Sequence, residues 1–163
     1  MDKIHFRVWC EFEVNGKIET SMESPASWFL LTQTGKVLEY GPLSRPHPPL
    51  PKYKKVIPLF WTGLLSKNGE EIYEGDIVVK DEYIWFEEGE PNYRGTVEWI
   101  YSQWQVVAHC INPNKRGISD GINTDLNDDG IEEGEKSDWK VIGNIYESKH
   151  LLDNDSIRGQ IRR

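Results

Sequence analysis

Apolar and polar residues alternate with a period of two along the first part of the chain. Between residues 4 and 14, every second position is apolar, and most of the positions between them are polar. This period is typical of a strand that buries one of its faces. Asn15-Gly16 follows at once, and both residues tolerate a positive φ. The sequence therefore predicts a tight hairpin turn and a returning strand over 17–21.

Further short apolar runs predict more strands of the same kind. Two hairpins are expected from paired runs, one over 28–32 and 36–40 and the other over 96–101 and 104–111. Between residues 56 and 79, a second Asn-Gly turn and a bend at Gly75 separate short strands. No segment has a long helical period, and only the polar tail suggests a short helix. The chain is predicted to be mainly β, built from small antiparallel subdomains with little helix.

Two segments interrupt these strands. Residues 41–55 contain five prolines, whose fixed φ and missing N–H prevent helix and central strand alike, so a linker or surface strap is expected. Residues 112–138 are rich in Gly, Asp, Asn and Glu and too poor in apolar residues for a buried element, which predicts a long surface loop. The predicted parts are an N-terminal hairpin region with its strap (1–55), a β domain with the acidic loop (56–147) and a tail (148–163).

Three segments, in order, resemble the YopX family of bacteriophage and prophage proteins. Residues 62–78 read TGLLSKNGEEIYEGDIV, residues 141–147 read VIGNIYE, and the start of the chain carries Ile4, Phe6, Arg7 and Trp9 in the spacing of the family. The resemblance implies a β-rich fold with a small SH3-like barrel and a phage or prophage origin, and it implies no assigned reaction. Three positions depart from the family pattern: Trp61, Ser66 and Cys10.

The charge of the chain bears on nucleic-acid binding. A formal charge of −8 and a pI near 5.0 disfavour nonspecific binding to phosphates, which depends on Lys and Arg. Two short basic clusters leave a local patch open as an alternative: Lys52, Lys54 and Lys55 in the strap, and Arg158, Arg162 and Arg163 in the tail.

Catalytic motifs are missing from the sequence. The four histidines are scattered, and none stands in a known nucleophile motif. His109 and Cys110 are adjacent, but neighbouring side chains of a strand point to opposite faces and cannot form a dyad. We expect no enzyme activity and no cofactor.

A calcium loop is the most specific metal hypothesis. Asp125, Asn127 and Asp129 alternate as in the first half of an EF-hand loop, where oxygen donors surround the ion. The twelfth position of that register is Lys136 in place of a bidentate glutamate. An acidic, solvated loop is therefore the favoured interpretation, and these three residues are only a weak calcium candidate.

Arg7, Trp9 and Trp61 are the candidate binding residues. Arg7 and Trp9 share one side of the first strand, where an exposed tryptophan beside an arginine would stack on a base or on a partner's side chain. The alternative, which we favour, is a strand buried on both faces with Trp9 in a second small core.

The remaining features concern compartment and partners. Cys10 and Cys110 are far apart, no leader precedes an apolar segment, and no apolar run approaches the ~20 residues of a membrane span, so a cytoplasmic protein with free thiols is expected, although a disulfide stays open. We expect a noncatalytic module that binds an unidentified host or phage protein, or itself as a homo-oligomer. A nucleic-acid-binding module that uses an SH3-like barrel surface is the alternative.

Overall fold

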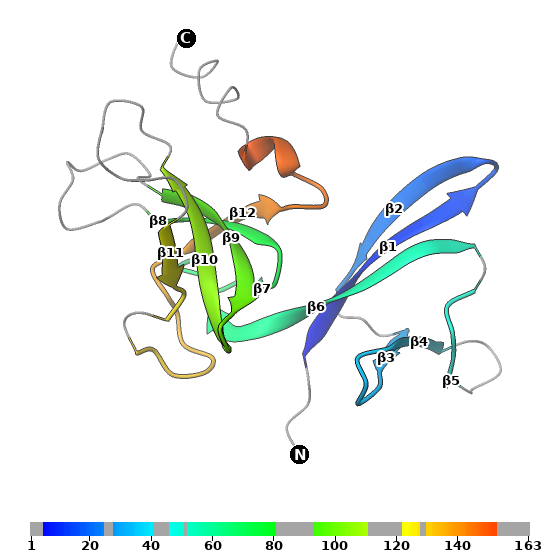
Figure 1. Ribbon diagram of the computed structural model, residues 1–163, viewed down its shortest axis with the longest axis horizontal. Helices are drawn as coiled ribbons and strands as arrows, with labels where there is room; N and C mark the ends of the chain where they lie inside the picture. The colour runs from blue at the N-terminus through cyan, green and yellow to red at the C-terminus, as the bar shows by residue number, and fades with distance from the viewer. Residues whose placement is uncertain are drawn as a thin grey trace, which may run out of the picture. The chain divides into compact units, whose positions relative to one another are not determined.

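The computed structural model describes residues 5–24, 28–40, 46–50, 52–80, 93–110, 122–127 and 130–152. These residues form short strands and one 3-10 helix (Figure 1), and their bounds in chain order are β1 (Phe6–Val14), β2 (Lys17–Glu23), β3 (Phe29–Leu31), β4 (Val37–Tyr40), β5 (Pro46–His47), β6 (Tyr53–Leu65), β7 (Glu71–Tyr73), β8 (Asp76–Lys80), β9 (Tyr93–Ile100), β10 (Gln103–Cys110), β11 (Ile122–Asp125), β12 (Lys140–Asn144) and η1 (Lys149–Leu152). The mainly β class is confirmed, as are the three predicted hairpins, which are β1–β2, β3–β4 and β9–β10.

The chain divides by its contacts into an N-terminal unit, 1–61, and a C-terminal unit, 62–163. The division falls within β6, whereas the sequence predicted a boundary after residue 55. β6 serves both units, because Val56 packs against the N-terminal core and Leu64 belongs to the C-terminal core. Most of the predicted tail, 148–163, lies outside the described residues.

The N-terminal unit is built around β1, which pairs antiparallel with β2 on one side and with β6 on the other. A separate three-stranded sheet has the order β3-β4-β5, so the strap predicted over 41–55 includes the two-residue β5 and the start of β6. Val8, Cys10 and Phe29 form the core. The Tyr53 ring packs edge-on against Phe29, with 6.0 Å between ring centroids.

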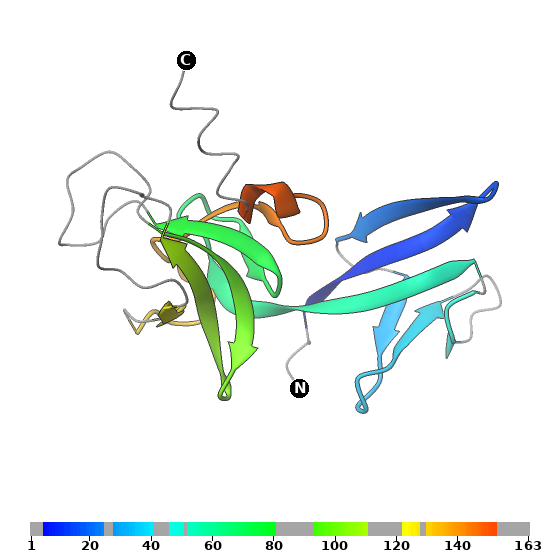
Figure 2. The same ribbon diagram turned by 45° about the horizontal axis from the view of Figure 1, so that its top comes forward.

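The C-terminal unit contains a five-stranded antiparallel sheet with the order β11-β10-β9-β8-β12. The sheet curls into a half-barrel, which is seen in the turned view of Figure 2. The larger core belongs to this unit and is formed by Leu64, Ile72, Val78, Val97, Val106, Leu126 and Trp139. Within the described residues β11 and β12 are the outer strands of the sheet, and the SH3-like closure implied by the family resemblance stays a prediction.

The acidic segment 112–138 was expected to contain no buried element, and this expectation was wrong. Residues 122–125 form β11 on the edge of β10, and Leu126 beside them is only 1% exposed. Further along, the Leu65 N–H donates to the Glu135 carbonyl and the Ser137 N–H donates to the Leu65 carbonyl. A single well-placed leucine and backbone pairing to β10 and β6 thus hold a polar segment in place.

Candidate interaction surface

Aromatic side chains gather at the turn of the β9–β10 hairpin. Val97 and Val106 face each other across the two strands in the core, and one step nearer the turn Trp99 faces Trp104. The two indole rings meet edge to face, with 4.9 Å between their centroids. Trp104 also packs against the core, so Trp99 and Trp104 extend the buried row of side chains out to the surface.

The turn itself has an unusual backbone for its sequence. Tyr101 has a φ of 51° and Ser102 a φ of 65°, both in the left-handed region. Two successive positive φ angles are the pattern of the type I′ turn, which suits the twist of a hairpin and normally carries Asn or Gly. For a bulky residue such as tyrosine, this region is strained, at a cost of about 1–3 kcal/mol.

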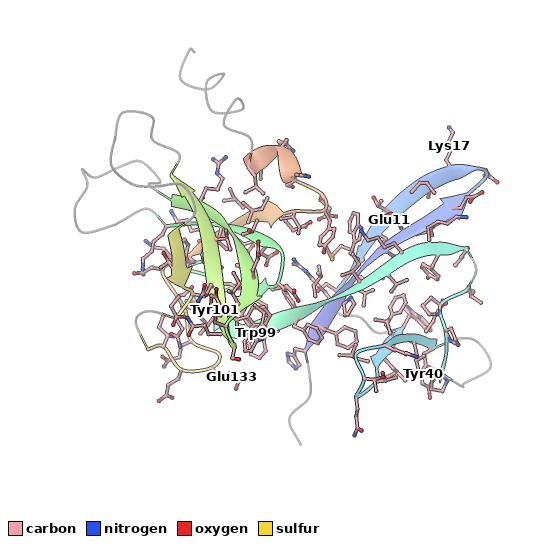
Figure 3. All side chains as sticks on the ribbon, in the orientation of Figure 1. Glu11, Lys17, Tyr40, Trp99, Tyr101 and Glu133 are labelled. Carbon is pink, nitrogen blue, oxygen red and sulfur yellow. The ribbon has the colours of Figure 1, made fainter. Side chains whose placement is uncertain are left out.

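Burial of the turn does not offset this strain. The Tyr101 side chain is 88% exposed and Trp99 is 55% exposed. Figure 3 shows both side chains at the same end of the hairpin. Clustered, exposed aromatic groups on a tightly paired hairpin have the chemistry of a protein-contact surface, since they offer a large apolar area with few rotatable bonds. We call Trp99, Tyr101 and Trp104 the aromatic tip.

The binding residues predicted from the sequence lie elsewhere, in the N-terminal unit. Trp9 is buried at 4% exposure between Val8 and Cys10, and its indole N–H donates to Glu11 at 3.4 Å. Arg7 is half-buried on the same strand. Trp61 is half-buried, and its ring centroid lies 5.1 Å from that of His5. β1 is thus buried on both faces around Trp9, whose face is not offered to a ligand.

At the weak calcium candidate, the side chains of Asp125 and Asn127 form hydrogen bonds with backbone groups of the same loop. The Asp125 carboxylate accepts the Asn127 N–H at 2.9 Å. The Asn127 side chain both donates to the Ile131 carbonyl and accepts the Ile131 N–H. Asp129 lies outside the described residues. Within the described ranges, no group of three or more His, Cys, Asp or Glu is arranged to hold a metal ion.

Cys10 is a buried free thiol with a suppressed acidity. Burial, with the added negative charges of Glu23 and Glu39, raises the pKa of this thiol to about 11. The thiolate, which is the reactive form, is therefore scarce at neutral pH. The side chain of Cys110 lies outside those described, as do Arg158, Arg162 and Arg163 of the tail.

The two longer motifs quoted above, 62–78 and 141–147, meet in the half-barrel. β8 pairs with β12 so that Asp76 faces Asn144. Gly75 has a φ of 78°, its N–H donates to the Val97 carbonyl, and its carbonyl accepts the Ile145 N–H. A Cβ at Gly75 would lie 3.3 Å from the Tyr146 ring. Glycine is required here both by the backbone conformation and by close packing.

The polar members of these motifs satisfy backbone groups. The buried Asp76 carboxylate accepts the Tyr73 N–H at 2.8 Å and so fixes the bend that precedes β8. The Asn144 side-chain oxygen accepts the N–H groups of Tyr146 and Glu147, which fixes the turn after β12. These residues carry the architecture of the half-barrel, because their side-chain oxygens are engaged with backbone N–H groups.

The fold and the aromatic tip together define a class: a small β protein whose motif residues build a half-barrel and whose exposed surface carries clustered aromatics. A comparison with protein families matches the YopX protein family over residues 43–153, and the chain belongs to this family. No curated protein matches the sequence closely enough to be reported. In the described part of the chain, no helix has the length and apolar character needed to cross a membrane.

Sequence reasoning did not single out the aromatic tip. The alternation over 96–101 places Val97, Trp99 and Tyr101 on one face, and by itself this pattern predicts only a strand. A usable signal was present in the turn. Two strands joined by Tyr101-Ser102 need a two-residue hairpin turn, and no glycine or asparagine supplies the positive φ. When a hairpin turn lacks the glycine or asparagine that its backbone favours, the side chain in its place serves a purpose other than stability.

Proposed function

We propose that this YopX-family protein is a noncatalytic accessory protein of a phage or prophage, active in the host cytoplasm, which binds a protein partner through the aromatic tip. One observation carries the proposal: Tyr101 is 88% exposed while held in a strained turn beside Trp99. A turn that served folding alone would be more stable with asparagine and glycine. The tip suits a partner with an apolar pocket that admits a protruding tyrosine.

The rest of the structure supports binding over chemistry. The motif residues Asp76 and Asn144 are engaged with backbone groups, and the acidity of Cys10 is suppressed. Among the described residues, support for the nucleic-acid alternative is reduced, because Trp9 is buried and offers no face on which a base could stack. Nucleic acid remains a distinct outcome of the experiment.

The experiment is a pull-down of tagged protein from phage-infected host lysate, with and without nuclease, followed by mass spectrometry. Tyr101→Ser tests the tip, and Ile18→Ser is the matched control, because Ile18 is another exposed apolar residue (57%) next to a hairpin turn. We expect a protein partner that survives nuclease, is kept by Ile18→Ser and falls at least tenfold with Tyr101→Ser.

Two results would contradict the proposal. Partners that disappear on nuclease treatment would indicate nucleic-acid binding. A partner that both variants retain equally would show that binding uses another surface. Thermal melts of both variants serve as the folding check, because neither side chain belongs to a core.

A further inference from the structure

A groove with a volume of about 590 Å³ lies within the N-terminal unit, far from the aromatic tip in sequence. Its walls include two runs of consecutive residues, 35–38 beside β4 and 53–56 in β6. Side chains of consecutive strand residues point to opposite faces. The wall built from consecutive residues of β6 is therefore the edge of that strand. The facing wall is the start of β4, which already has β3 and β5 as neighbours in its own sheet.

The β6 edge in this groove keeps backbone groups turned outward. The Trp61 N–H donates to the His5 carbonyl across the β1–β6 pair. Because antiparallel pairing alternates, the backbone groups of Val56 and Pro58 point away from β1. Proline has no N–H to leave unpaired, so its place on the outer side of an edge is favourable. β7 is three residues long and meets β6 near Thr62, and no described strand pairs with β6 over 54–58 on this side.

The charged residues among the described side chains that line the groove are all lysines, in a chain with a net charge of −8. Lys36 is exposed and forms no ion pair among the described residues. Lys54 is 2.8 Å from the Glu13 carboxylate and Lys55 is 3.9 Å from that of Glu11. Both pairs are partly exposed, so they contribute little and can be exchanged for carboxylates of a ligand.

The other lining residues are mostly apolar and half-buried, among them Val37, Leu38 and Val56. Among the described side chains of the groove Tyr53 is the one aromatic residue, and its ring is packed edge-on against Phe12 and Phe29. It is held in the core contact and is poorly placed to stack on a nucleobase. An apolar floor flanked by lysines fits a peptide in which apolar and acidic side chains alternate.

We propose that this groove binds an extended acidic peptide segment of a protein partner, which adds as a strand to the edge of β6. Backbone groups of β6 would bind the peptide backbone, the floor would take every second side chain, and Lys36 and Lys55 would bind the carboxylates between them. A second copy of this chain is a poor occupant, because its own β6 edge carries the same lysines and would be repelled.

The test begins with selection of random twelve-residue peptides on the full-length protein. We expect enrichment of peptides in which Asp or Glu alternates with aliphatic residues. The affinity of a selected peptide, measured by fluorescence anisotropy, should fall at least tenfold with Lys36→Glu combined with Lys55→Glu, and it should also fall as salt is raised. Lys17→Glu is the matched control, since Lys17 is an exposed lysine of the same unit at the turn of the first hairpin (Figure 3).

A charge exchange separates lost binding from misfolding. The peptide with its acidic residues changed to lysine should bind the double variant and not the unchanged protein. Enrichment of basic or neutral peptides, equal loss with Lys17→Glu, or displacement of the peptide by single-stranded DNA would overturn the proposal. Tyr101→Ser should leave peptide binding unchanged, so this site and the aromatic tip stand or fall separately.

Discussion

Two hairpin turns of this protein share one backbone conformation and carry opposite kinds of residue. In the first hairpin, Asn15 and Gly16 have φ angles of 53° and 76°, and in the third, Tyr101 and Ser102 have φ angles of 51° and 65°. Asparagine and glycine enter the left-handed region at low cost, and tyrosine does not. The first turn therefore carries the residues that stability favours.

The comparison shows that the residues of the third turn are not those that stability favours. Both turns connect antiparallel strands of seven to nine residues, so the demands of the sheet are similar in each. Only the third places an aromatic side chain in solvent, beside the paired rings of Trp99 and Trp104. Strain that the sheet does not need points to a requirement outside the fold, and we assign that requirement to partner binding.

The largest expected effect comes from adding a second glycine turn, at Gly75, to the comparison. Gly75 and Gly16 have nearly equal φ angles, 78° and 76°, but only Gly75 is crowded. Gly75→Val should lower the free energy of unfolding by about 3 kcal/mol or more, because strain and overpacking add. Gly16→Val should cost about 1–2 kcal/mol, because nothing lies within 4 Å of its Cβ. Urea unfolding measures both, and equal losses would show that crowding by Tyr146 is not felt.

Exchanging the two turn sequences should change stability in opposite directions. Tyr101→Asn with Ser102→Gly should raise the free energy of unfolding by about 1–2 kcal/mol, since it removes strain. Asn15→Tyr with Gly16→Ser should lower it by a similar amount. Urea unfolding of the two double variants measures the difference, and an unchanged stability in the first would mean that the third turn is not strained.

The same two variants sharpen the functional side of the comparison. Partner capture in the pull-down should be lost by the first and kept by the second. A more stable protein that no longer binds is the signature of a residue kept for function. A first variant that is both more stable and fully able to bind would contradict the role of the aromatic tip.

A smaller effect on stability, around the first hairpin, is expected at alkaline pH. The first hairpin packs Cys10 near Tyr53, and burial, together with the charges of Glu39, Cys10 and Glu23, raises the pKa of the Tyr53 hydroxyl from 10.0 to about 12. A pKa raised by folding gives stability that is complete below pH 10 and is lost as the pH rises towards 12. Cys10 should act in the same way between pH 9 and 11.

Thermal melts across this range measure the effect. The melting temperature of the unchanged protein should fall more steeply between pH 10 and 12 than that of Tyr53→Phe, which has no hydroxyl to ionise. Below pH 9 the two curves should run parallel, and this range is the internal control. Parallel curves throughout would show that the Tyr53 hydroxyl ionises equally well in the folded and unfolded chain.

Local signals were enough to predict most of the strands. The period of two over 4–14 and the Asn-Gly turn after it specify β1 and β2 without help from the rest of the chain. β11 shows where local signals fail. Its residues, Ile122 to Asp125, are mostly polar, and the strand exists because β10 offers an edge and Leu126 reaches the core. Such tertiary support is invisible in a window of local sequence.

The candidate sites were harder to predict than the strands. For Trp9 the sequence left two interpretations open and favoured burial. The structure agrees with the favoured one, since Trp9 is 4% exposed on a strand that pairs with the distant β6. The groove depends on how residues 35–38 lie opposite 53–56, which no motif records. The aromatic tip was within reach of sequence reasoning, through the missing glycine at 101–102.

The pairing of β8 with β12 also sets an order of events during synthesis. The half-barrel needs Asn144 opposite Asp76, whereas the strands of the N-terminal unit are complete once Trp61 has been made. At about 5–20 residues per second, roughly 4–17 s separate the two moments on the ribosome. For the last part of that interval, from Lys80 to Asn144 and roughly 3–13 s at the same rate, the apolar β8 has no β12 to cover its edge. Nascent chains of this protein are thus most vulnerable to aggregation just before their last strand is made, and rapid translation of residues 80–144 protects them.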